Sequence, residues 1–220
     1  MILIEKQSEP EEWKKIRRSP NPDFNSADKT ALRKSLLQEQ GYLCAYCMRR
    51  IRDDGKTPIR IEHYEARNPE NTFDYKNLLA VCSGGERKNE KNDPERYTCD
   101  KKKQNGKLTI DPQNKADMET ISYDLRGRII SNNKQFQKEL DEVLNLNDSN
   151  GYLIRNRAAA ISPIRTKLSK CGPGQDVLLM LNKWKEKFSK KNDSGEYEEY
   201  VGIIRWYIER SIRHHSHKKK

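Results

Sequence analysis

Four of the five cysteines in the chain lie in one stretch, at Cys44, Cys47, Cys82 and Cys99. The first two form a Cys-x-x-Cys turn that can present two thiols to one ion. Zinc prefers thiolate ligands, and four thiolates complete its tetrahedral shell, so we expect a structural zinc site here. A redox Cys-x-x-Cys pair and buried unligated thiols remain the alternatives, although the flanking sequence lacks a thioredoxin-like pattern. Cys171 stands apart and is expected to be an ordinary thiol.

The same stretch contains an acid–histidine pair, Glu62-His63, and His63 is the only histidine before residue 214. Hydrolysis of a phosphodiester needs a base for water and a hard divalent cation. His63 suits the base because imidazole titrates near neutral pH, and Glu62 suits a cation that prefers oxygen ligands. Neighbouring residues on a strand point to opposite faces, so both reach one site only if the chain bends. A hydrogen-bonded structural histidine is the alternative.

The flanking pattern predicts the elements that position these residues. An apolar face predicts a helix over residues 27–40, with Ser26 as its N-cap and Gly41 just after its end. Two strands, 58–64 and 77–82, follow on either side of a polar loop. A long charged loop, 83–98, then leads to a short helix from Cys99 to Lys103. The resulting order is strand, loop, strand, helix.

The remaining pattern predicts an α+β protein. Residues 8–25 are expected to be mainly loop, and short β pieces are expected at 108–111, 121–123 and 128–130. From residue 131 the hydrophobic period becomes helical, with a helix over 152–169 that contains Pro163 and apolar stripes over 177–188 and 200–208. We expect a region 1–130, whose central motif is 41–106, and a helical region 131–220. The end, 214–220, is expected to be a frayed tail.

Composition favours a polyanionic partner. The chain carries a formal net charge of +11, and residues 152–191 contribute +8 of it through ten Lys or Arg and two acids. Nucleic acid is the commonest partner of such a chain, whereas a solvated helix surface is the alternative for this segment. There is no apolar run long enough to span a membrane and no signal-peptide pattern, so we expect no membrane partner and a cytoplasmic location without disulfides.

The order Cys-x-x-Cys, acid-His, Asn-Leu, Cys, Cys-acid-x-x-Lys resembles the HNH endonuclease family over residues 41–106. Segments 61–64, 75–79 and 144–147 further resemble the PtuB-like family, which contains the HNH subunits of Septu and some retron-associated antiphage systems. That weaker similarity extends to about residue 157. The resemblance implies a ββα-metal nuclease core and an effector nuclease that cleaves DNA or RNA.

The resemblance also implies roles for single residues. His63 would be the general base, and Asn77 would tie the loop together and orient that base. Glu62 would hold a catalytic Mg²⁺ or Mn²⁺ beside the structural zinc. Asp100 stands where the family usually has His or Asn, and it would be a second cation ligand. Lys103, with Lys102 beside it, would contact phosphate.

Partners are implied by the same resemblance. PtuB-like proteins work with a PtuA-like ATPase, and in retron systems also with a reverse transcriptase and its RNA–DNA product. The helices after residue 131 would then be the docking surface. Two alternatives to a nuclease stay open: a zinc-stabilised nucleic-acid-binding module, and a scaffold subunit without catalysis.

Overall fold

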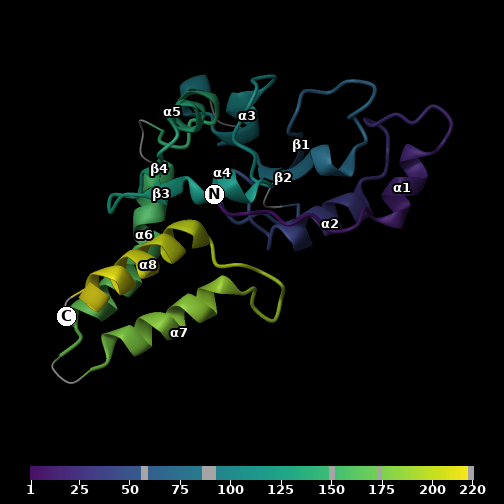
Figure 1. The fold of residues 1–220 in the computed structure, drawn as a ribbon. Helices are drawn as coiled ribbons and strands as arrows, with labels where there is room; N and C mark the ends of the chain where they lie inside the picture. The colour runs from purple at the N-terminus through teal and green to yellow at the C-terminus, as the bar shows by residue number, and fades with distance from the viewer. Residues whose placement is uncertain (56–58, 86–92, 149–151, 173–174, 218–220) are drawn as a thin grey trace.

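A computed structural model describes residues 1–55, 59–85, 93–148, 152–172 and 175–217. In these residues it contains a mixture of helices and two small two-stranded sheets. Figure 1 shows α6, α7 and α8 together at one end of the molecule, α1 at the other, and the first sheet between them. No described helix is long and apolar enough to cross a membrane.

The first sheet is the centre of the N-terminal half. Strand β1 (Ile59–His63) pairs antiparallel with β2 (Leu78–Cys82), so that His63 lies opposite Leu78 and Ile59 opposite Cys82. Every residue of β2 is buried, as expected for an uninterrupted apolar run. Helices α2 (Thr30–Glu39) and α3 (Cys99–Lys103) both pack against β2. The predicted strand, loop, strand, helix order is therefore present.

The segments before this sheet differ in detail from the prediction. Residues 8–25 contain a helix, α1 (Glu11–Arg17), because Trp13 is buried against Phe24 and Phe73. Ser26 does not cap α2; instead the Asp28 carboxylate accepts a hydrogen bond from the backbone N–H of Thr30. A 3₁₀ turn, η1 (Tyr75–Asn77), precedes β2, and another, η2 (Pro94–Arg96), precedes α3.

A second sheet joins the two halves. Helix α4 (Lys115–Glu119) leads into β3 (Ile121–Tyr123), which pairs antiparallel with β4 (Ile129–Ser131). The β piece predicted at 108–111 is wrong, because Thr109 and Ile110 donate their backbone N–H groups to the buried carboxylate of Glu139. These donors are thereby satisfied without a neighbouring strand.

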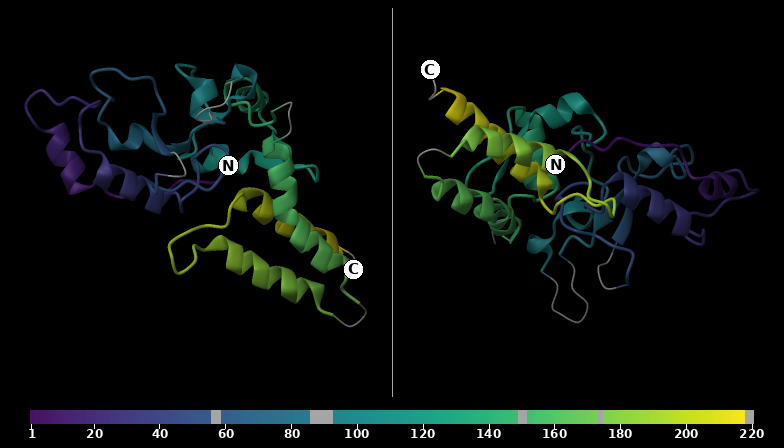
Figure 2. Two further views of the ribbon diagram at one scale, coloured as in Figure 1. Left: turned by 180° about the vertical axis from the view of Figure 1, so that it is seen from behind. Right: turned by 90° about the horizontal axis from the view of Figure 1, so that it is seen from below.

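The C-terminal half is helical, as predicted. It comprises α5 (Lys134–Lys138), a π-helical turn η3 (Glu139–Val143), α6 (Tyr152–Ser169), α7 (Val177–Ser189) and α8 (Val201–His217). Figure 2 shows α7 beside α8, which also packs against α6. The frayed tail was predicted to begin at residue 214, but α8 continues to His217. Within it, His215 Nδ1 makes a contact of 2.8 Å with Ser211 O. Residues 218–220 lie outside the described part.

One hydrophobic cluster extends through both predicted regions, from Met1 to Ile208. The segment before α8 packs on the Cys-x-x-Cys turn, where Tyr200 N donates to Met48 O over 3.1 Å and Tyr197 N to Gly41 O over 3.0 Å. Gly41 has φ +58°, and an added Cβ would overlap the Tyr197 ring. The end of the chain therefore supports the turn that carries the first two cysteines.

Candidate metal centre and acid–histidine site

Three separate elements bring the four cysteines together. Cys44 and Cys47 lie in the turn after α2, which closes through an isolated bridge between Leu43 and Arg50. Cys82 ends β2, and Cys99 begins α3.

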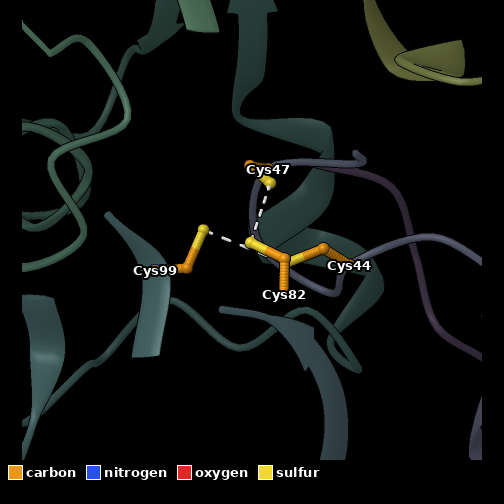
Figure 3. A group of neighbouring side chains, drawn as sticks. All are labelled: Cys44, Cys47, Cys82 and Cys99. Carbon is orange, nitrogen blue, oxygen red and sulfur yellow. Dashed lines mark hydrogen bonds between the residues drawn. The ribbon is translucent and has the colours of Figure 1, made fainter. Parts of the chain in front are cut away.

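The sulfur geometry fits a tetrahedral metal site. All four Sγ atoms lie within 4.8 Å of one another and all four cysteines are buried. Two of the sulfur pairs are in hydrogen-bond contact, Cys47 with Cys82 at 3.7 Å and Cys44 with Cys99 at 3.9 Å, and Figure 3 marks both with dashed lines. Zinc–sulfur bonds of about 2.3 Å in a tetrahedron place sulfurs about 3.8 Å apart. The cluster could therefore hold a metal ion such as zinc.

The ionisation of the thiols points the same way. Burial raises the pKa of Cys44, but hydrogen bonds with Cys47, Cys82 and Cys99 outweigh it and lower that pKa well below its ordinary value. The hydrogen bond to Cys44 in turn raises the pKa values of Cys47 and Cys99. One thiol is thus favoured as a thiolate while its neighbours are favoured as protonated thiols. A bound divalent cation would remove this difference, because it favours the deprotonated form of every ligand.

Segment 144–147 supports the cysteine cluster. Leu144 O accepts a hydrogen bond of 2.9 Å from the backbone N–H of Cys99. The Asn145 amide donates to the carbonyls of Tyr97 and Glu95 over 2.9 and 3.1 Å. This segment therefore holds the start of α3, from which both Cys99 and Asp100 extend.

Glu62 lies in a buried polar cluster near that helix. Its Oε1 atom is 2.7 Å from Lys103 Nζ and 3.3 Å from the Tyr46 hydroxyl. Burial, followed by a hydrogen bond with Asp100 and repulsion from its charge, raises the pKa of Glu62 to about 8. Arg60 lies 3.6 Å from the Asp100 carboxylate on the outer side of the pair. Two carboxyl groups this close together could hold a cation that prefers oxygen ligands.

His63 contacts a different set of groups. Its Nε2 atom lies 2.9 Å from Thr72 O, and its Nδ1 atom lies 3.2 Å from Arg67 Nε. A guanidinium can only donate and a carbonyl can only accept, so the imidazole is neutral with its proton on Nε2. Phe24 packs edge-on against the ring at 4.7 Å. Burial first, and then the charge of Arg67, lower the pKa of His63 below its ordinary value of 6.5, although the Thr72 contact opposes this.

Asn77 ties together the loop that contains Thr72. Its Oδ1 atom accepts from Glu65 N over 2.8 Å, and its Nδ2 atom donates to the carbonyls of Glu65 and Asn71 over 3.1 and 3.4 Å. The backbone continues this tie, since Tyr64 N donates to Asn77 O. The loop is thus closed at its base, and its Thr72 carbonyl is held against His63.

The structure thus groups the predicted site residues in two sets. Glu62, Asp100 and Lys103 lie together, whereas His63 and Asn77 share the loop. Different partners for Glu62 and His63 follow from the alternation of side chains along β1.

The phosphate contact predicted for Lys103 needs correction. Its side chain is 1% exposed, and its ammonium group is held by the Glu62 carboxylate and by His63 O at 3.2 Å. A group so placed cannot meet a substrate from solvent without breaking a buried ion pair. Lys102 is half-buried on the same helix, and its role stays a prediction.

Sequence reasoning missed two residues that touch the site. Tyr46 lies inside the Cys-x-x-Cys turn, where its hydroxyl reaches Glu62. Arg67 lies in a polar loop with nothing in its type to distinguish it from the other cations. Its position four residues after the histidine was the only available signal.

Comparison with known proteins adds no family assignment. No protein-family model matches the chain, and no curated protein matches it. The function is therefore argued from the site.

Proposed function

We propose that the chain is a metal-dependent endonuclease of the HNH type that hydrolyses phosphodiester bonds of nucleic acid. The observation that carries the proposal is the pairing of Glu62 with Asp100, together with a neutral His63 that follows Glu62 on the same strand. The supporting arrangement is β1, a tied loop, β2 and α3, next to four buried thiols. This is the order expected of a ββα-metal core stabilised by zinc.

The cysteine cluster would hold a structural zinc, because four thiolates leave no open position for substrate. Glu62 and Asp100 would hold a Mg²⁺ or Mn²⁺, which neutralises phosphate charge and stabilises the leaving oxygen. Lys103 Nζ now lies 2.7 Å from Glu62 Oε1, so its ammonium lies where part of the cation's charge would be. It would have to move aside or remain as a second positive charge.

His63 would act as the general base through Nδ1. The Thr72 carbonyl holds the proton on Nε2, which leaves the Nδ1 lone pair free to take a proton from water once Arg67 is displaced. Asn77 would keep the loop and thus the ring in place. Phe24 excludes water from one side of the imidazole.

We further propose that this nuclease is the effector of an antiphage system of the Septu or retron type. The support is the PtuB-like pattern in segments 61–64, 75–79 and 144–147, together with the +11 charge. A PtuA-like ATPase would be its partner, and in a retron system also the reverse transcriptase with its RNA–DNA product. The exposed lysines of α7 would be available to such partners.

A second candidate function is a zinc-stabilised nucleic-acid-binding or scaffold subunit without catalysis. The specific observation in its favour is the buried Lys103–Glu62 contact, which gives the Glu62 carboxyl group a partner without a cation. Binding alone, however, requires neither the acid–histidine pair nor the tied loop.

Cleavage by the full chain together with its partners tests the proposal. Plasmid DNA, single-stranded DNA and RNA are incubated with Mg²⁺ or Mn²⁺, and separately with chelator. We expect divalent-dependent cleavage that His63→Ala lowers by about 10²–10⁴-fold, while His214→Ala, an exposed histidine on α8, leaves it unchanged. Asp100→Asn should stay active because it restores a common family residue, and Asp100→Ala should be impaired. A folded, metal-loaded His63→Ala protein that cleaves at the wild-type rate would overturn the nuclease proposal.

A further inference from the structure

The Nδ1 atom of His63 is covered by a cation from the loop that follows β1. Arg67 Nε lies 3.2 Å from this atom, and the guanidinium also lies 4.6 Å above the Phe24 ring and 3.2 Å from Asn25 Oδ1. The Arg67 side chain is exposed, whereas His63 is buried. An exposed guanidinium therefore lies against the Nδ1 side of a buried imidazole.

Arg67 has no acidic partner in the part of the chain that the structure describes. Its hydrogen-bond acceptors are an imidazole nitrogen and a side-chain amide, both neutral. Lys29 lies on the same aromatic ring, 4.9 Å from its centre, and its ammonium donates only to the carbonyls of Asn25 and Ala27. Two cations therefore share one ring. Asp23 and Asp28 lie near enough to Lys29 to act on its charge, but in the described residues neither carboxylate forms an ion pair with Arg67 or Lys29.

A phosphate is a better acceptor for this guanidinium than a neutral imidazole. Arginine matches two phosphate oxygens with its planar fork, and a phosphate carries the full negative charge that a neutral imidazole lacks. A phosphodiester bound in this way would draw Arg67 from Nδ1 and stay beside it. The vacated lone pair could then accept a hydrogen bond from a water molecule that faces the phosphorus.

We propose that Arg67, assisted by Lys29, is the phosphate-binding residue of the site and covers the His63 base until a phosphodiester displaces it. The inference rests on the proposed function, because it assigns to Arg67 the contact that the sequence assigned to Lys103. It also gives the site a built-in dependence on substrate: the base is available for water only when the guanidinium has a phosphate to hold.

Binding without divalent cation tests the phosphate contact. The probe is a fluorescent 20-nucleotide DNA, as a single strand and as a duplex, titrated against the full chain at several salt concentrations. Arg67→Ala should weaken binding by about 10- to 100-fold, the loss expected for a hydrogen bond to a charged group. It should also lower the salt slope by about 1. Arg67→Lys should keep the slope and lose less affinity, because it keeps the charge but not the fork.

Arg126→Ala is the matched control, since Arg126 is exposed on the β3–β4 turn, away from the site. Arg67→Ala protein that binds as tightly as this control, with the same salt slope, would overturn the phosphate contact. Thermal unfolding and zinc content of each variant show whether it is folded.

Carbethoxylation of His63 by diethyl pyrocarbonate tests the covering of the base. The reagent attacks an unprotonated imidazole nitrogen, and mass spectrometry of the peptide resolves His63 from the histidines of α8. Arg67→Ala should react several-fold faster than both wild type and Arg126→Ala. An unchanged rate would overturn the covering contact.

The two proposals fail in different ways. Absence of cleavage by the wild type would remove the proposed function, while weaker DNA binding by Arg67→Ala would still establish the anion site. A wild type that cleaves, beside an Arg67→Ala variant that binds and cleaves equally well, would remove the inference alone.

Discussion

We expect Lys103→Met to destabilise the protein in a pH-dependent way that a divalent cation reverses. Lys103 Nζ lies 2.7 Å from Glu62 Oε1, and the two side chains are 1% and 6% exposed. Removal of one member of a buried pair typically costs about 3–5 kcal/mol while the other stays charged. Glu62 avoids part of this cost by binding a proton, because burial and the neighbouring Asp100 raise its pKa to about 8.

The direction with pH follows from that raised pKa. Between pH 4.5 and 8 the folded protein holds a proton on Glu62 that the unfolded chain has lost, so stability falls as pH rises through this window. In Lys103→Met the cation that lowers the Glu62 pKa is gone, and the fall continues to higher pH. Relative to wild type we expect a loss of about 1–3 kcal/mol at pH 6, where mainly hydrogen bonds are lost. At pH 9 the loss should approach about 3–5 kcal/mol.

Urea denaturation at pH 6 and pH 9 measures both values. Lys102→Met, on the same helix, is the control, and the double variant Glu62→Gln with Lys103→Met should recover most of the loss because no charge stays buried. Mg²⁺ at about 100 times its Kd should restore about 2.7 kcal/mol to Lys103→Met. If Lys103→Met is as stable as Lys102→Met at both pH values, the buried pair is not formed. If Mg²⁺ restores nothing, Glu62 and Asp100 are not a cation site, and the binding-module alternative gains.

Three further outcomes are expected. Cys47→Ser should lose about one zinc per chain and become insoluble, because binding of a structural zinc contributes about 10–16 kcal/mol to folding. Cys171→Ser should keep both its zinc and its solubility. Metal analysis measures the zinc, and a zinc-loaded, stable Cys47→Ser protein would contradict the site. The cleavage rate should fall on the acid side only below pH 6.5, because the base must be unprotonated and the pKa of His63 is lowered. A fall that begins above pH 7 would contradict the buried environment of His63 beside Arg67. Charge reversal on α7 should weaken binding to nucleic acid or partners and reduce its salt dependence, and unchanged binding would indicate a solvated helix face. The residues for this reversal are Lys183, Lys185 and Lys187.

Local pattern was enough to predict the sheet and the cysteine cluster. The run of apolar residues from Leu78 to Cys82 has no polar interruption, so its burial on both faces could be inferred. The cysteine spacing placed two thiols in one turn, and the end of β2 and the start of α3 brought the other two to it. The sheet strand and the Cys-x-x-Cys turn depend on residues close together in sequence, whereas the joining of all four cysteines was inferred from the ligand preference of zinc.

Lys103 and Trp13 were not predictable in this way. A lysine in a basic run is normally solvated, and its burial here depends on a carboxylate 41 positions earlier in the chain. Helix α1 is only seven residues long and is too short to form alone. It forms because Trp13 packs against Phe24 and Phe73, which lie in segments that the pattern describes only as loops.

Helix α3 is where the two parts of the site depend on each other. It has five residues, too few for an independent helix, and it starts with Cys99 at φ +54°, a conformation that residues other than glycine rarely adopt. Three contacts hold it: the sulfur cluster, the hydrogen bond from Cys99 N to Leu144 O, and the Lys103–Glu62 pair. Asp100 lies between these anchors. A metal on the cysteines would therefore fix the position of the carboxylate beside Glu62, although it takes no part in the chemistry itself.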